Sequence, residues 1–208
     1  EDRIAELDAS DMRTVATHTF PKAGNMVSLP DGILVADAME LHAFIRWETA
    51  EAILSHRIES SPDDPSPALS MANLAFRAGR YPRIAPAVDR VLDVRDRSPD
   101  SASSQTARKR LIESLRNMLA AGKQRWDPAT DSRMLNSGSR IPPVAVLVDL
   151  AQRFARAAES PSELAEYELA MGWLGEARSS PNASIEAYGR LLSDDSLADA
   201  QVLGDFGE

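Results

Sequence analysis

Several features that carry chemistry in other proteins are absent from this sequence. It contains no cysteine, which excludes disulfide bonds, thiolate metal ligands and a cysteine nucleophile. No apolar run approaches the length that spans a bilayer, so we expect no membrane insertion within this chain. The ten glycines are spread singly, and neither a P-loop nor a GxGxxG motif is present. We therefore expect no thiol chemistry and no glycine-rich phosphate loop.

Lysine is also scarce, and acidic residues outnumber basic ones. The chain has only three lysines (Lys22, Lys109 and Lys123), and its formal net charge is −9. Such a surface repels phosphate backbones, so we expect no nucleic-acid partner. The local exception is the cationic run 108–110 with Arg116 downstream. It lies on a helical pattern whose other face is apolar, and we interpret it as a solvated polar face.

The residues that most often perform catalysis are few and unclustered. The histidines are His18, His42 and His56, and none stands with a carboxylate in an HExxH-like arrangement. The acid pairs 63–64 and 194–195 lie at expected helix ends, where carboxylates act as caps. We therefore expect no catalytic residue, no metal and no cofactor, and we predict that the protein is not an enzyme.

Apolar residues recur mostly at helical spacing. Leu34, Ala38, Leu41 and Ile45 fall on one face, and the strongest amphipathic pattern covers residues 103–121. Only residues 26–35 suggest alternation with period two, so we predict an all-α chain. Further apolar helical faces cover residues 50–58, 68–78, 84–92, 146–158, 164–177, 185–192 and 197–206, with a weaker one in residues 1–18.

Turn residues give the expected ends of these helices. Pro86 requires its helix to begin at or just before it, because proline breaks a helix interior. Gly122 is placed to end the helix of residues 103–121. Ser160 is a candidate N-cap with Pro161 at the first helical position, and residues 126–140 are expected to be mainly loop.

The side-chain sizes repeat when the sequence is shifted by 34 residues. Small residues coincide where two helices of a hairpin must approach closely, and large aliphatic residues coincide in the second helix. Trp47 coincides with Tyr81 at the corner between the helices. The other coinciding pairs are Leu34 with Ala68, Ala38 with Ala72, Leu41 with Ala75, Ala50 with Ile84, Leu54 with Val88, and Ile58 with Leu92.

This pattern resembles the tetratricopeptide repeat (TPR) family, whose unit is a 34-residue pair of antiparallel helices. The resemblance implies an α-solenoid of helix hairpins and a protein-binding role. The matching residues are Ala38, Ala72 and Gly172 at the small eighth position, Gly79, Arg80 and Tyr81 at the corner, Leu54, Val88 and Tyr188 in the second helix, and Pro62 at the close.

The resemblance also gives a domain organisation. Residues 1–30 are expected to be an N-terminal helix and loop extension, and residues 31–208 a TPR-like helical repeat domain. Its hairpins are expected near 31–64, 65–98 and 162–196, with an irregular stretch at 99–160 and a last helix at 197–206.

In the TPR family, the first helix of each hairpin lines a concave face that holds a partner. Carried onto this sequence, the partner-binding positions are Met39, Asn73 and Trp173, then His42, Phe76 and Glu176, and finally Arg77. Asn73 and Arg77 stand one turn apart, a spacing suited to a peptide backbone or a terminal carboxylate. The alternative for Phe76 and Trp173 is that they are hairpin core.

We therefore predict a non-catalytic scaffold that binds a peptide or protein segment on a concave helical face. The alternative is a helical accessory or structural domain of a larger assembly or enzyme, including one of the cell envelope. A third hypothesis, a domain that binds a small molecule or lipid, would require a closed apolar pocket. The sequence leaves the partner, the oligomeric state and the compartment open.

Overall fold

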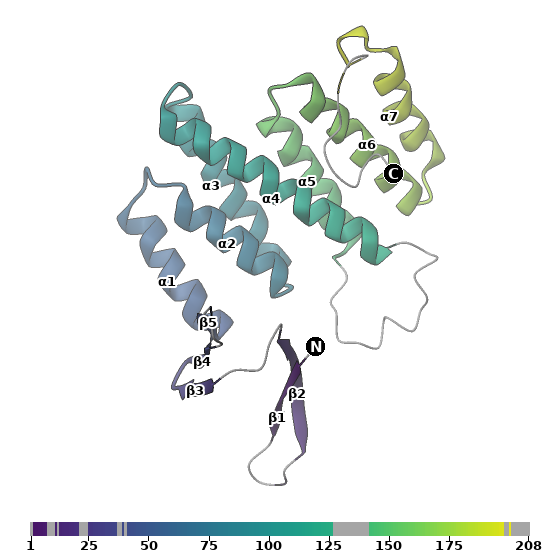
Figure 1. The fold of residues 1–208 in the computed structure, drawn as a ribbon. Coiled ribbons are helices and arrows are strands. Elements are labelled where there is room, and N and C mark those ends of the chain that lie inside the picture. The colour runs from purple at the N-terminus through teal and green to yellow at the C-terminus, as the bar shows by residue number, and fades with distance from the viewer. Residues whose placement is uncertain are drawn as a thin grey trace. The chain divides into compact units, whose positions relative to one another are not determined.

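The computed structural model describes residues 2–7, 11, 13–20, 25–36, 39, 41–126, 142–197 and 200. The chain divides into two compact units, Glu1–Ile53 and Leu54–Glu208. Strands dominate the first unit and helices the second (Figure 1). Most of the described residues are helical, which confirms the expectation of a helical protein in its coarse form.

The first unit contains two small antiparallel sheets. One pairs β1 (Asp2–Leu7) with β2 (Thr14–Phe20), and the other is a meander of β3 (Asn25–Leu29), β4 (Gly32–Ala36) and β5 (Leu41–Ile45). A two-residue turn places Leu29 opposite Gly32. A Cβ at Gly32 would come within 2.2 Å of the Phe44 carbonyl oxygen, so the close approach of β4 and β5 there requires glycine.

These strands correct the prediction for the start of the chain. Residues 1–18 contain strands instead of a helix, and the predicted hairpin 31–64 is helical only from α1 (Trp47–Ser60) onward. The apolar residues between Leu34 and Ile45 fit a helical spacing, but the tight turn at 30–31 and the pairing of β4 with β3 and β5 give strands instead. Ala38, the small residue assigned to this hairpin, lies outside the described residues.

The corner residues of the first two predicted hairpins also differ in their surroundings. Trp47 follows a strand, and its indole Nε1 donates to the carboxylate of Glu51 at 2.7 Å. Tyr81 follows a helix and lies edge-on to Phe76, with the ring centroids 6.3 Å apart. The 34-residue correspondence therefore does not extend to the first half of the first copy.

The second unit is a chain of helices, each of which packs against the next (Figure 1). The short 3-10 helix Tyr81–Arg83 precedes α3, and another, Asp195–Leu197, follows the last α-helix. The helices are α2 (Ser66–Arg77), α3 (Ile84–Arg97), α4 (Ala102–Trp126), α5 (Val144–Ala157), α6 (Pro161–Ala177) and α7 (Pro181–Ser193). The hairpins expected near 65–98 and 162–196 are thus helical pairs, α2–α3 and α6–α7.

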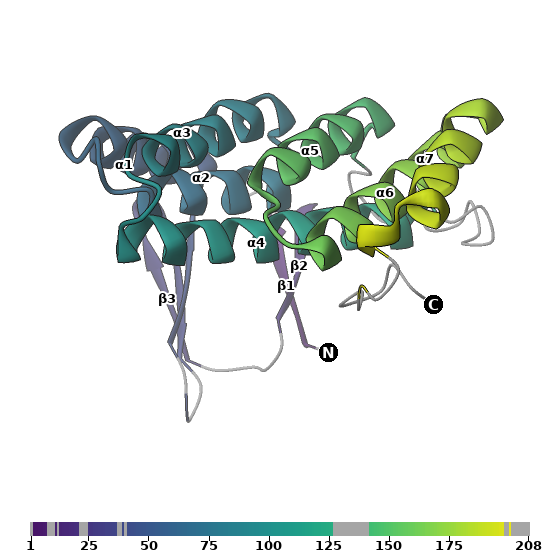
Figure 2. The same ribbon diagram turned by 90° about the horizontal axis from the view of Figure 1, so that it is seen from above.

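Alternate helices of this unit also contact each other, which produces two layers. Figure 2 shows α3 beside α5 in one layer and α2 beside α4 in the other. α6 lies against both α4 and α5, and α7 pairs with α6. The core between the layers is aliphatic, and Val88, Leu115 and Leu147 are fully buried within it.

The helix starts follow the capping chemistry that the sequence indicates. Ser160 accepts a hydrogen bond from the Glu163 backbone N–H, and the Glu163 carboxylate accepts one from the Ser160 backbone N–H. This reciprocal capping box confirms the predicted N-cap of α6. α3 begins at Ile84, so Pro86 stands within its first turn as predicted.

Two glycines mark places where helices nearly touch. A Cβ at Gly172 would lie 2.1 Å from the Tyr188 ring, which confirms a small residue at the close approach of α6 and α7. Gly122, predicted to end its helix, lies instead inside α4, which continues to Trp126. A Cβ there would lie 2.5 Å from Leu147, so packing against α5 is the physical reason for this glycine.

The two remaining expectations fall outside the described residues. The loop predicted at 126–140 begins at the last residue of α4, and the rest of it is not described. Most of the last predicted helix, 197–206, is likewise not described.

Candidate binding groove between α2 and α4

A groove of about 450 Å³ lies between α2 and α4 in the second unit. The two helices run in the same direction, because the start of α2 lines the groove together with the start of α4, and Asn73 meets Ser114 further along. The lining combines hydroxyl, apolar and amide side chains with a single arginine. It includes Ser66, Leu69 and Asn73 from α2 and Ser103, Thr106 and Arg110 from α4.

Asn73 is held in place by both helices. Its Nδ2 donates to the Leu69 carbonyl oxygen at 3.1 Å and to the Ser114 hydroxyl at 3.2 Å. These bonds use the amide hydrogens and orient the side chain, so Oδ1 is the atom that can accept a hydrogen bond from a ligand. A fixed amide of this kind suits the recognition of a peptide N–H.

Two exposed arginines supply positive charge to the same layer of helices. Arg110 lines the groove from α4, and Arg77 lies at the end of α2, one turn beyond Asn73. Neither pairs with a carboxylate among the described residues, whereas arginines such as Arg116 and Arg153 do. An anionic group in this part of the structure would therefore find unneutralised guanidinium groups.

Only some of the predicted partner-binding residues lie in the groove or on the helices that form it. Asn73 lines the groove, and Arg77 lies on the same helix. Phe76 and Trp173 are buried, with 8% and 7% of their surfaces exposed, so both belong to the helix core. Glu176 is exposed and accepts a hydrogen bond from the Tyr188 hydroxyl at 3.0 Å.

The two predicted binding residues of the first copy do not lie on a helix. Met39 is 85% exposed and lies in a bend, and His42 lies in β5. Neither therefore occupies the first helix of a hairpin. Their assignment to a concave helical face is therefore wrong.

The α4 side of the groove was missed by the sequence reasoning. Ser103, Thr106 and Arg110 follow one another at steps of three and four, the spacing of a single helical face. That polar stripe was visible as the face opposite the apolar one, but nothing in the sequence indicated that α2 lies beside it.

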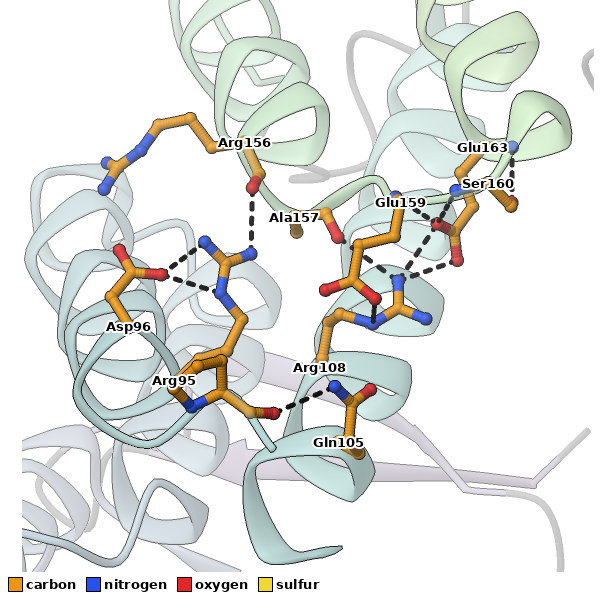
Figure 3. Close-up of polar contacts among 10 residues, drawn as sticks. Arg95, Asp96, Gln105, Arg108, Arg156, Ala157, Glu159, Ser160 and Glu163 are labelled. Carbon is orange, nitrogen blue, oxygen red and sulfur yellow. Dashed lines mark hydrogen bonds and ion pairs between the residues drawn. The ribbon is translucent and has the colours of Figure 1, made fainter. Parts of the chain in front are cut away.

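Arg108 does not belong to the solvated face to which we assigned it. It is 8% exposed, and its Nη1 donates to both Glu163 carboxylate oxygens at 3.0 Å and to the Ala157 carbonyl oxygen at 3.2 Å. Glu159 approaches its Nε at 3.1 Å. Figure 3 shows the guanidinium of α4 reaching the turn that precedes α6. This arginine joins helices and is not available to a partner.

A second buried pair joins the same two helices. Arg116 of α4 donates to both oxygens of Glu166 of α6, at 2.9 and 3.1 Å, and Glu166 is 1% exposed. Arg116 is therefore not a solvated cation either, which corrects its assignment. The reason is that α6 brings two carboxylates against α4, a contact between residues about 50 positions apart that helical periodicity cannot show.

Glu163 makes the stability of the contact between α4 and α6 depend on pH. Burial would raise the pKa of Glu163, but the backbone N–H groups of Glu159 and Ser160 and the Arg108 guanidinium together lower it from its ordinary value of 4.5. A carboxyl group with a lowered folded-state pKa stabilises the protein above its unfolded-state pKa, and this contribution disappears as the pH falls through the folded-state pKa.

We therefore expect Glu163→Gln to lower the melting temperature at pH 7 but to have a progressively smaller effect below pH 4.5. Thermal melts between pH 7 and pH 3 measure this difference. Glu159→Gln is the matched control, because Glu159 is about half exposed and contacts the same arginine. A Glu163→Gln effect that stays constant over this pH range would contradict the expectation.

No family model, no curated protein and no solved structure matches this chain. Within the described ranges, no group of three or more histidine, aspartate or glutamate residues is arranged to hold a metal ion. None of the helices in the described ranges combines the length and apolar character that a membrane crossing requires.

Proposed function

We propose that this chain is a non-catalytic scaffold that binds a peptide or protein segment in the groove between α2 and α4. The observation that carries the proposal is the groove itself, which combines the oriented Asn73 amide with the unneutralised Arg110 guanidinium. An extended peptide offers the matching groups, because its backbone N–H donates to an amide oxygen and a carboxylate pairs with arginine.

The arrangement of the helices supports a TPR-like solenoid as the scaffold. α2 and α4 lie side by side, α3 and α5 lie side by side, and each helix packs against the next (Figure 2). In the TPR family the first helices line the binding face, and the family's second, fifth and ninth positions fall here on Ser66, Leu69 and Asn73. All three residues line the groove.

The test is a peptide selection with matched charge reversals. Peptides from a displayed random library are selected on the 208-residue chain, and their affinities are measured by fluorescence anisotropy. We expect Arg110→Glu to weaken binding by about tenfold or more, because it reverses the charge that faces the ligand.

Lys109→Glu is the matched control for this reversal. Lys109 is also exposed and neighbours Arg110 on α4, but it does not line the groove. It changes the net charge by the same amount, so it should leave the affinity nearly unchanged. Equal losses in the two variants, or a library that yields no binding peptide, would contradict the proposal.

The alternative is a structural domain that holds a larger assembly together. The observation that favours it is the outer side of α7, where Ile185 and Leu192 are 67% and 87% exposed. Apolar side chains at one end of a helical array are what a packed neighbour would cover. Binding through the groove depends on Arg110 and not on Ile185, whereas assembly through α7 depends on Ile185 and not on Arg110.

A further inference from the structure

The helix face with which α2 lines the groove extends beyond Asn73. Leu69 and Asn73 line the groove four positions apart, and the next step of four reaches Arg77. Arg77 is exposed on α2, as Arg110 is on α4, and neither forms an ion pair with a carboxylate among the described residues. Each of the two helices therefore presents one unneutralised arginine along the same line.

The hydrogen bond between Asn73 and Ser114 shows how far apart these arginines lie. Its length of 3.2 Å places position 73 of α2 level with position 114 of α4. Because the two helices run in the same direction, Arg110 is level with position 69, one turn before Asn73, and Arg77 lies one turn after it. The separation along the helix axis, from position 69 to position 77, is about 12 Å at about 1.5 Å per residue.

Acidic residues lie at one end of the groove and not along it. None of the described residues that line the groove is acidic, and Glu113 of α4 is not among them. Asp64 precedes α2 and Asp100 precedes α4, and both are exposed. Asp64 accepts a hydrogen bond from the Ser66 backbone N–H at 2.9 Å, so it caps the start of α2. An acidic ligand group is therefore attracted by the two arginines and repelled at the helix starts.

An extended peptide with two acidic side chains four positions apart matches this charge pattern. Such a chain advances about 3.3 Å per residue, so a separation of about 12 Å is closest to four positions. Side chains at this spacing also lie on the same side of an extended chain, as contact with both arginines requires. The backbone N–H groups between them pass Asn73, whose Oδ1 is the atom that accepts.

Resting on the proposed function, the inference names the class of ligand that the groove selects. We propose that the ligand is an internal, extended peptide segment whose acidic residues at positions i and i+4 pair with Arg110 and Arg77. Both pairs join a carboxylate to a guanidinium, which is the strongest type of hydrogen-bonded contact that this groove offers.

The net charge of the chain, −9, makes the spacing of the acids selective. It repels an acidic peptide over most of the protein surface, so such a peptide gains only where its carboxylates reach the two arginines. Two acids at another spacing keep the repulsion and lose one of the pairs. The affinity should therefore depend on where the acids stand in the peptide and not only on their number.

Synthetic peptides of constant composition test this spacing. Each contains two glutamates in a background of serine, threonine and valine, with an acetylated N-terminus and an amidated C-terminus that remove the terminal charges. The glutamates stand at neighbouring positions, four positions apart or eight positions apart, and fluorescence anisotropy measures binding to the 208-residue chain. We expect the spacing of four to bind about tenfold more tightly than either of the others.

Charge swaps assign each arginine to one of the two acids. Arg110→Glu should weaken binding about tenfold, and replacement of one peptide glutamate by lysine should restore it. Arg77→Glu should be restored by lysine at the other glutamate. Lys109→Glu is the control, because Lys109 is exposed beside Arg110 but does not line the groove, and it should leave the preference for a spacing of four unchanged. Circular dichroism verifies that the variants keep their helices.

The outcomes separate this inference from the proposed function. Equal affinity at all spacings, rescue of both variants by the same lysine, or library-selected peptides that bind without an acid pair at this spacing would each overturn the inference and leave peptide binding in place. Designed peptides that fail while library peptides bind would do the same. If neither library nor designed peptides bind, the proposed function is contradicted and the inference is overturned with it.

Discussion

Replacing Arg116 by methionine is expected to destabilise the protein by about 3 kcal/mol. The substitution keeps most of the side-chain volume but leaves the carboxylate of Glu166, which is 1% exposed, without two of its hydrogen bonds. A buried charge that loses part of its compensation is costly because the protein interior solvates it poorly. Urea unfolding followed by circular dichroism measures the loss, and the melting temperature should fall by about 6–12 °C.

The double variant Arg116→Met with Glu166→Leu identifies the cause of this loss. It removes both charges and fills the site with apolar groups, so we expect it to recover most of the stability lost in Arg116→Met. A control at Arg97 separates buried from exposed pairs. Arg97 donates to the Asp63 carboxylate at 2.8 Å, but both side chains are more than half exposed, so Arg97→Met should cost less than about 1 kcal/mol. Similar losses at Arg116 and Arg97 would contradict this account.

Gly172→Ala is expected to destabilise the α6–α7 hairpin by about 1–2 kcal/mol. The added Cβ would lie 2.1 Å from the Tyr188 ring. The ring cannot easily move away, because its hydroxyl donates to Glu176 at 3.0 Å. Alanine favours a helix over glycine by about 1 kcal/mol, and the clash must exceed that gain for the variant to be less stable.

Gly189→Ala is the matched control in the same hairpin. Gly189 is an exposed residue of α7, and a Cβ there would meet no atom within 4 Å. The same chemical change should therefore stabilise the protein by about 0.5–1 kcal/mol through helix propensity alone. Thermal or urea unfolding of the two variants should show shifts of opposite sign. If Gly172→Ala stabilised the protein instead, α6 and α7 would be able to move apart at this point without a loss of unfolding free energy.

The helices of the second unit could be predicted from the sequence because their signals are local. Ser160 with Glu163 forms a capping box, and Pro86 lies in the first turn of its helix, as the residue types require. The strands β4 and β5 of the first unit were missed because the apolar residues between Leu34 and Ile45 satisfy a helical spacing and do not alternate with period two. There the tight turn and cross-strand packing decided the structure.

The candidate site could be predicted only on one of its two sides. Asn73 was identified through its place in the repeat, and it lines the groove. Arg110 was not identified, because its position beside α2 depends on the packing of α4 and not on local spacing. For the same reason Arg108 and Arg116 were assigned to solvent, although carboxylates more than 45 positions away bind them.

The length of α4 makes the helices of the second unit depend on one another. This 25-residue helix contacts α2, α3, α5 and α6, and its residues Arg108 and Arg116 are bonded to carboxylates of α6. In an ideal repeat array each unit depends only on its neighbours, and the ends can fray without disturbing the middle. Here, separation of α6 would take the carboxylates of Glu163 and Glu166 away from the arginines of α4. The same helix, α4, forms one wall of the groove. Loss of order at the α6–α7 hairpin would thus be transmitted to the α4 wall of the groove instead of stopping at α5.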